Sequence, residues 1–163
     1  MIIQYPITPE LHNLALNWSS FSGNHLSITT NSNSKYAGNL AEVMFQLLYP
    51  EAIRISQTDY QADFILNGLR IDIKCKLRSV PCTLDYQVSV EERIIDFNTD
   101  YYVFFSYYPA TLELLGGLSK PDYLTLSHPP DIPLPSPCRN LTIRQLSPLQ
   151  RQAYAPQGSR QRS

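Results

Sequence analysis

The chain holds few of the residues that build zinc sites and disulfide frameworks. Of its 163 residues, 3 are cysteines and 3 are histidines. They are scattered without the paired spacing of zinc ligands, at Cys75, Cys82, Cys138, His12, His25 and His128. The sequence therefore argues against a structural zinc site and against a fold held by disulfides. We expect Cys75 to face the core as a small apolar side chain.

Long apolar runs are also missing. A membrane-spanning helix needs about 18 or more consecutive apolar residues, and no such stretch occurs. The first residues lack the basic, apolar and small-residue pattern of a secretory leader, so we expect a cytoplasmic protein. A chain of this length can bury a substantial core, which predicts one domain over residues 1–147. Residues 148–163 offer almost nothing to bury, and we expect a disordered basic tail there.

The chain lacks the strong positive charge of proteins that coat nucleic acids. Its formal net charge is −1, whereas binding to phosphate backbones without sequence preference depends on many lysines and arginines. The basic residues are nonetheless grouped, because no acidic residue follows Asp131 and several arginines do. Another basic group lies between Arg70 and Arg78. Such local patches on a near-neutral chain favour an enzyme that binds a defined site over a general coating protein.

The most informative segment runs from Asp63 to Lys76, with the sequence DFILNGLRIDIKCK. An Asn-Gly pair between two apolar runs is the strongest short-range signal for a hairpin, since both turn positions need φ > 0. With Asn67 and Gly68 as the turn, Asp63 pairs with Asp72 across two antiparallel strands. The two carboxylates then share one face of the sheet, roughly 5 Å apart.

Alternation along the second strand separates apolar from polar side chains. One face carries Leu69, Ile71, Ile73 and Cys75, and the other carries Arg70, Asp72, Lys74 and Lys76. Adjacent carboxylates repel each other, so the fold gains nothing from them unless a cation lies between. Mg²⁺ is held by one or two carboxylates together with waters and phosphate oxygens. Lys74 would then orient an attacking water or neutralise charge on a phosphate. The alternative is a solvated polar face with no further role.

A helix with a central glutamate is predicted upstream of the hairpin. Residues 36–48 carry apolar side chains at helical spacing, and Pro50 ends the pattern. Glu42 lies in the middle of this helix. A strand over 53–57 follows, so the chain continues as three successive strands. On its own, such a glutamate is usually a solvated surface residue.

The remaining segments complete the pattern. We predict a short helix over 11–18 with Leu11, Leu14 and Trp18 on one side, and a polar loop over 19–34. The other expected strands and connectors are strands at 101–108, 112–119 and 141–146 and a proline-rich connector at 128–137. Residues 88–97 fit either a helix or a strand that leads into a helix.

Four residues occur in an order that resembles the motif of the PD-(D/E)XK nuclease superfamily: Glu42, Asp63, Asp72 and Lys74. The likeness covers about residues 36–126. Ala62 stands where many members have proline, and an aspartate begins the Asp-x-Lys motif where glutamate is commoner. The resemblance implies an α/β (α+β) fold with an αβββαβ core, in which helices flank a central mixed sheet.

The resemblance also implies a Mg²⁺ site in which Mn²⁺ can substitute. Asp63 and Asp72 would bind the metal, and Lys74 would lie beside the attacking water. Glu42 would hold the hydration shell of the metal or a second ion. Phosphate contacts that position DNA would come from Arg70, Lys76 and Arg78. Gln87 lies where some members keep a polar residue that faces the site.

The sequence therefore predicts a Mg²⁺-dependent endonuclease that cuts double-stranded DNA at specific sites, of the restriction or homing type. Small single-domain members of the superfamily usually dimerise to cut both strands, which implies a homodimer or homotetramer. A junction-resolving or recombination nuclease is a close alternative. An alternative of another class is a DNA-binding or assembly protein that has the fold without catalysis. The choice between DNA and RNA stays open at this point.

Overall fold

The computed structural model describes residues 1–18, 32–55, 61–133 and 135–149. They form an α+β fold, in which helices pack against a six-stranded mixed sheet and a separate two-stranded sheet lies beside it. The strands are β1 (Ile3–Pro6), β2 (Ile53–Arg54), β3 (Phe64–Leu66), β4 (Leu69–Leu77), β5 (Gln87–Glu91), β6 (Tyr101–Tyr108), β7 (Thr111–Ser119) and β8 (Cys138–Thr142). The helices are α1 (Pro9–Trp18), α2 (Ser32–Leu48), α3 (Glu92–Ile95) and α4 (Lys120–Leu126), with a 3₁₀ turn at Ile143–Gln145. Among the described residues, no helix is long and apolar enough to cross a membrane.

The large sheet has the strand order β1-β7-β6-β4-β3-β2. Strands β4 and β6 run parallel, and the other neighbours in this sheet are antiparallel. Parallel neighbours require a crossover connection, and the chain between β4 and β6 supplies it with β5 and the short helix α3. Strand β5 then pairs with β8 to form the small sheet. The parallel pair β4–β6 is therefore the centre around which the rest is arranged.

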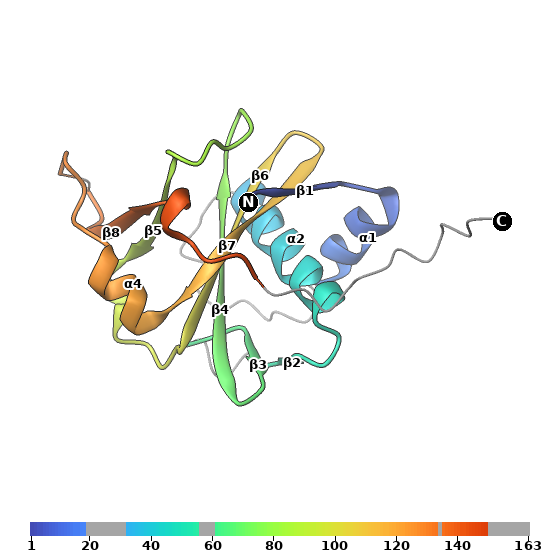
Figure 1. Cartoon of the computed structure of the whole chain (residues 1–163). Coiled ribbons are helices and arrows are strands. Elements are labelled where there is room, and N and C mark those ends of the chain that lie inside the picture. The colour runs from blue at the N-terminus through green and yellow to red at the C-terminus, as the bar shows by residue number, and fades with distance from the viewer. Residues whose placement is uncertain (19–31, 56–60, 134, 150–163) are drawn as a thin grey trace, which may run out of the picture.

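Two apolar cores lie on opposite faces of the large sheet. Figure 1 shows α1 and α2 on one side, and the β5–β8 sheet with α4 on the other. Val103 and Phe105 of β6 pack in the core with α1 and α2. Tyr102 and Phe104 point the other way and pack in the core with β5, β8 and α4. Strand β6 is thus buried on both faces, as its dense run of apolar and aromatic residues predicts.

The predicted helices form, with two corrections. Helix α2 begins at Ser32, so the polar loop expected over 19–34 is wrong for its last three residues, and residues 19–31 lie outside the described part. In α1, Leu14 is 39% exposed, whereas Leu11 and Ala15 are buried. The expected apolar side is therefore wrong at Leu14. Positions four residues apart face the same way on a helix, and the stripe formed by Leu11 and Ala15 is the one that packs against α2.

Other boundaries also differ from the prediction. The strand expected over 53–57 has only two residues in β2, and residues 56–60 are not described. The ambiguous segment 88–97 contains both elements, strand β5 followed by helix α3. The strand expected over 141–146 ends at Thr142, because Thr142 and Gln145 form a capping box that starts the 3₁₀ turn. Cys75 packs against the core of α1 and α2, as expected.

The Asn-Gly hairpin forms in the predicted register. Asn67 and Gly68 have φ angles of 51° and 79°, and Leu66 lies opposite Leu69. The ladder between β3 and β4 ends at the pair of Phe64 and Ile71. Asp63 therefore lies one step beyond the regular ladder, and its position depends on bonds of its own.

Candidate active site

Asp72 and Lys74 form an ion pair on strand β4. Residues two apart on a strand point to the same face, and Lys74 Nζ lies 2.8 Å from Asp72 Oδ2. The side chain of Asp72 is 12% exposed and that of Lys74 is 28% exposed. Both side chains lie on the face that bears Tyr102, because Asp72 is the register partner of Tyr102 in the parallel ladder. The predicted pairing of a carboxylate and an ammonium on one face is thus present.

Asp63 is fixed beside Asp72 by two backbone contacts. Its amide donates to the carbonyl of Ile71 at 2.9 Å, and its Oδ2 accepts from the amide of Ile73 at 2.7 Å. These bonds hold Asp63 to both chain neighbours of Asp72. The expected ladder pair of Asp63 and Asp72 is thereby corrected, since the Asp63 side chain takes up a β4 amide at the point where β3 leaves the ladder.

Burial is the largest electrostatic effect on Asp63, and the neighbouring carboxylates add to it. Burial raises the pKa of Asp63 well above its usual 3.8, and the charges of Glu42 and Asp72 raise it further, against smaller opposing effects of Lys74 and the Ile73 amide. Burial by itself would lower the pKa of Lys74, but the carboxylates of Asp72 and Asp63 outweigh it and the pKa is raised. Lys74 is therefore a firmly protonated ammonium at neutral pH.

Glu42 lies on α2 and acts on Asp63 and Asp72 through its charge. Two residues that no pattern in the sequence assigns to the site hold its carboxylate. Trp18 Nε1 donates to Glu42 Oε2 at 2.7 Å, and Arg54 Nη2 lies 3.5 Å from the same oxygen. The guanidinium of Arg54 also lies over the indole ring, 4.0 Å from its centroid. Burial raises the pKa of Glu42, Trp18 and Arg54 lower it in part, and Asp72 raises it again. Glu42 therefore shares the electrostatic environment of both aspartates.

Trp18 and Arg54 carry no sequence signal for this role. They lie 24 and 12 positions from Glu42 along the chain, so no local motif links them to it. The spacing of Trp18 indicates only that it belongs to an apolar helix face. The contact arises because α1 packs against α2, which brings the last residue of α1 to the middle of α2.

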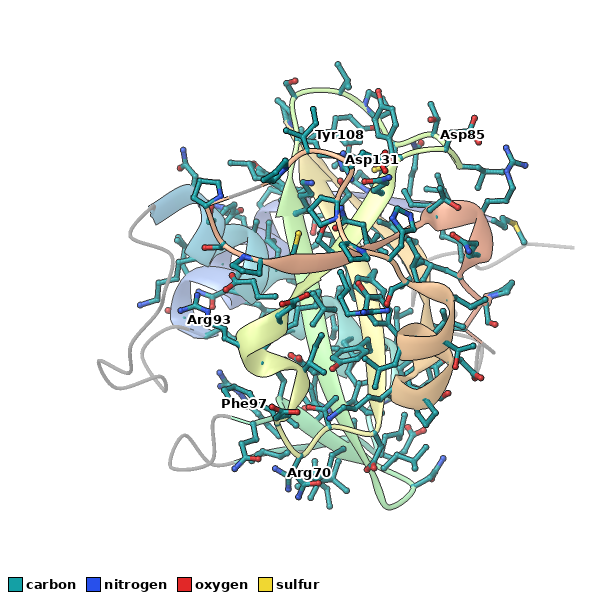
Figure 2. The ribbon with its side chains drawn as sticks, turned by 90° about the vertical axis from the view of Figure 1, so that its left-hand side faces the viewer. Arg70, Asp85, Arg93, Phe97, Tyr108 and Asp131 are labelled. Carbon is teal, nitrogen blue, oxygen red and sulfur yellow. The ribbon has the colours of Figure 1, made fainter. Side chains whose placement is uncertain are left out.

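The three residues predicted to contact DNA differ in their surroundings. Arg70 Nε donates to the carbonyl of Asn98 at 2.5 Å, and Figure 2 shows Arg70 at the same end of the molecule as Phe97. Arg78 Nη2 donates to the carbonyl of Gln87 at 2.7 Å. Lys76 is exposed. Burial of part of its side chain and then Arg78 lower its pKa. Arg70 and Arg78 thus tie loops to β4, and Lys76 has the most open position of the three.

Gln87 begins β5, opposite Thr142 of β8. Its side chain is half-buried, and its backbone carbonyl receives the hydrogen bond from Arg78. What the structure shows of Gln87 is this anchoring of the strand that follows the loop. A contact between its side chain and the carboxylates stays a prediction.

Asp63 and Asp72 are the two carboxylates that the hairpin brings close together. In the part of the chain that the structure describes, no group of three or more histidine, cysteine, aspartate or glutamate side chains is arranged to hold a metal ion. Mg²⁺ needs only one or two carboxylates when water and phosphate complete its shell. Asp63 and Asp72 carry hard oxygen donors. Burial, and then the charges of Glu42 and Asp72, raise the pKa of Asp63, so a cation beside it would favour its ionised form. Glu42 is bonded to Trp18 and Arg54 instead.

Comparison with known proteins adds no assignment to this picture. The sequence matches no protein-family model and no curated protein.

Proposed function

We propose that the protein is a divalent-metal-dependent nuclease that hydrolyses phosphodiester bonds of double-stranded DNA. The observation that carries this proposal is the group formed by Asp63, Asp72 and Lys74 on one hairpin. Asp63 lies in surroundings that raise its pKa, Asp72 lies beside it, and the Lys74 ammonium lies 2.8 Å from Asp72 Oδ2. Such a group costs stability unless a cation and an anionic substrate complete it.

The order of elements around the group supports the same proposal. Helix α2 precedes β2, β3 and β4, and after β5 the chain continues with α3 and with β6, parallel to β4. This is the αβββαβ order of the PD-(D/E)XK core, with β5 inserted before α3. In this proposal the first helix of the core is α2, which carries Glu42, and the second hairpin strand is β4, which carries the Asp-x-Lys motif.

Each residue has a role that follows from its position. Mg²⁺, when bound, would supply Lewis-acid polarisation of a phosphate oxygen and a hydroxide nucleophile at neutral pH. Asp63 and Asp72 would hold it. Lys74, as an ammonium, would donate to the phosphate oxygen on which negative charge develops. Glu42 keeps further negative charge beside the aspartates, oriented by Trp18 and Arg54.

The proposal extends to the mode of action. Lys76 would contact the phosphate backbone. Arg70, near the start of the same strand, and Arg78, directly after the strand, would add further phosphate contacts. The described residues of one chain present one such group, so cleavage of both strands requires a homodimer or homotetramer. Site-specific cleavage of the restriction or homing type is the first choice, and a junction-resolving or recombination nuclease is the second.

A non-catalytic DNA-binding or assembly protein is the competing proposal. The observation in its favour is that the charged groups neutralise one another within the chain, Lys74 with Asp72 and Arg54 with Glu42. In that case the hairpin would be a structural ion-pair network. DNA binding without cleavage would be the result.

The deciding experiment compares cleavage of supercoiled plasmid by the wild type and by Asp72→Asn and Lys74→Ala, with Mg²⁺ and with EDTA. We expect a loss of about 100-fold or more in each variant, since removal of one group that stabilises transition-state charge costs that much. Asp85→Asn is the matched control, because Asp85 is an exposed carboxylate paired with Arg144. Figure 2 shows Asp85 at the end of the molecule opposite Arg70. Cleavage by Asp72→Asn at the wild-type rate would reject the nuclease proposal.

A further inference from the structure

The hydroxyl of Tyr102 is buried and has no hydrogen-bond partner among the described residues. The residue is 0% exposed. An unpaired buried hydroxyl destabilises the fold, and each case in a folded protein calls for an explanation. Tyr102 lies on β6, the central strand that is buried on both faces.

The backbone places this side chain next to the carboxylate group. Asp72 of β4 and Tyr102 of β6 are register partners in the parallel ladder, so their side chains leave the sheet on the same face. The ring of Tyr102 is held by its neighbours. It packs edge-on against Tyr123 with centroids 5.2 Å apart and lies 6.3 Å from the ring of Phe104. The hydroxyl therefore has little freedom to find a partner elsewhere.

The charge that acts on this hydroxyl is that of Asp72. Burial raises the pKa of Tyr102 to about 12, and the negative charge of Asp72 adds to the shift. The phenol is consequently protonated at neutral pH and can act as a donor. Asp72 in turn is paired through its Oδ2 with the ammonium of Lys74.

We propose that Tyr102 is a positioning residue for Asp72. The Tyr102 hydroxyl donates to a water molecule, and this water donates to the Asp72 carboxylate. The inference rests on the proposed nuclease function. When Lys74 turns toward a phosphate, Asp72 loses its direct partner, and the bridge from Tyr102 keeps the carboxylate oriented toward a cation. A water bridge of this kind is nearly as favourable as a direct hydrogen bond, and partners that orient a ligand typically change metal affinity about 10- to 100-fold.

The test is a calorimetric titration with Mn²⁺ alone, on the full chain without DNA. We expect Tyr102→Phe to weaken Mn²⁺ binding about tenfold. Tyr5→Phe is the matched control, because Tyr5 also has a buried hydroxyl without a partner in the described residues. Tyr5 lies on β1, which β7 and β6 separate from β4. Its removal should leave Mn²⁺ affinity unchanged.

The outcomes separate the two proposals. Equal Mn²⁺ affinity in Tyr102→Phe and in the wild type would overturn the positioning role and leave the metal site intact. A wild type that binds no Mn²⁺ would overturn both. Thermal unfolding of Tyr102→Phe and Tyr5→Phe shows whether either substitution changes the stability of the fold. If the loss of an unpaired buried hydroxyl were the whole effect, Tyr102→Phe and Tyr5→Phe would change Mn²⁺ affinity alike. Only a change of Mn²⁺ affinity specific to Tyr102→Phe supports the inference.

Discussion

The indole of Trp18 gives the site an intrinsic reporter. Trp18 is the single tryptophan of the chain, and its Nε1 donates to Glu42 Oε2. Burial raises the pKa of Glu42 above its usual 4.5, and the effects of Trp18 and Arg54 offset this only in part. Protonation of Glu42 therefore changes the charge beside the indole at a pH where an ordinary glutamate is already ionised.

We predict that tryptophan fluorescence of the wild type follows a titration with its midpoint above 4.5. Glu42→Gln should remove this titration. Arg54→Gln should move the midpoint to higher pH, because the positive charge of Arg54 favours the ionised carboxylate. The measurement is a pH series with tryptophan-selective excitation, with circular dichroism to verify the fold. A wild-type midpoint below 4.5, or an unchanged curve in Glu42→Gln, would contradict the assigned contact.

Ionisation of Asp63 lowers the folding stability of the protein as the pH rises. Because burial, Glu42 and Asp72 raise its pKa in the folded state, the folded protein binds this proton more tightly than the unfolded chain does. The stability that Asp63 contributes is therefore fully present below pH 3.8, its usual pKa. It is lost as the pH rises through the folded-state pKa. At neutral pH the repulsion remains, which is typical of functional rather than structural carboxylates.

At the scale of the element, the β3–β4 hairpin sets the geometry of the site. Gly68 has φ of +79° and lies in open space, since a Cβ added to it would have no atom within 4 Å. The residue is thus required by backbone conformation and not by crowding. Gly38 also has open space around it, but it lies within helix α2, where its φ is not positive.

These two glycines make a matched pair for a stability prediction. Gly68→Ala should destabilise the protein by about 1 kcal/mol, because an L-residue in the left-handed region is strained. Gly38→Ala should stabilise it by about 0.5–1 kcal/mol, since alanine favours the helix and restricts the unfolded chain. Urea denaturation measures both. Changes of the same sign in the two variants would show that backbone conformation does not decide the hairpin.

Two arginines connect β4 to the loops around it. Arg70 and Arg78 bracket the strand and bond carbonyls of Asn98 and Gln87. These bonds join the crossover segment to β4 at both ends. The connection between the two parallel strands is therefore anchored to the strand that carries Asp72 and Lys74.

For the whole molecule, the proposed cation is linked to folding. The formal net charge of −1 gives the chain no general affinity for phosphate. In the proposed site, the carboxylates would bind the cation and Lys76 would bind the DNA phosphate. A ligand that binds only the folded state stabilises it in proportion to the logarithm of its concentration over Kd. A cation at the site would also offset the repulsion of Asp63 by Glu42 and Asp72, which adds to this stabilisation.

We predict that Mn²⁺ at about 100 times its Kd raises the Tm of the wild type by about 5–10 °C relative to EDTA. Asp72→Asn should lose most of this shift, because one of the two carboxylate donors is removed. Asp85→Asn should keep it. Differential scanning calorimetry gives the comparison. An equal shift in Asp72→Asn would place the cation elsewhere on the protein.

The sequence by itself determined the elements whose cause is local. The turn at Asn67 and Gly68 formed because few other residues accept its positive φ angles, and this fixed which face of β4 carries Asp72 and Lys74. The helix around Glu42 and the buried strand β6 followed from apolar spacing and from β-forming residues. These features were predictable because each depends on residues close together in the chain.

Only the tertiary structure decided which distant residues complete the site. Trp18 and Arg54 surround Glu42 because α1 packs on α2 and β2 lies nearby, and Tyr102 stands beside Asp72 because β6 joins β4 in parallel. The position of Asp63 just beyond the ladder was likewise set by the backbone of Ile71 and Ile73. Packing and strand order bring together residues that no spacing in the sequence relates, and for that physical reason the electrostatics of the carboxylates emerged only in the folded chain.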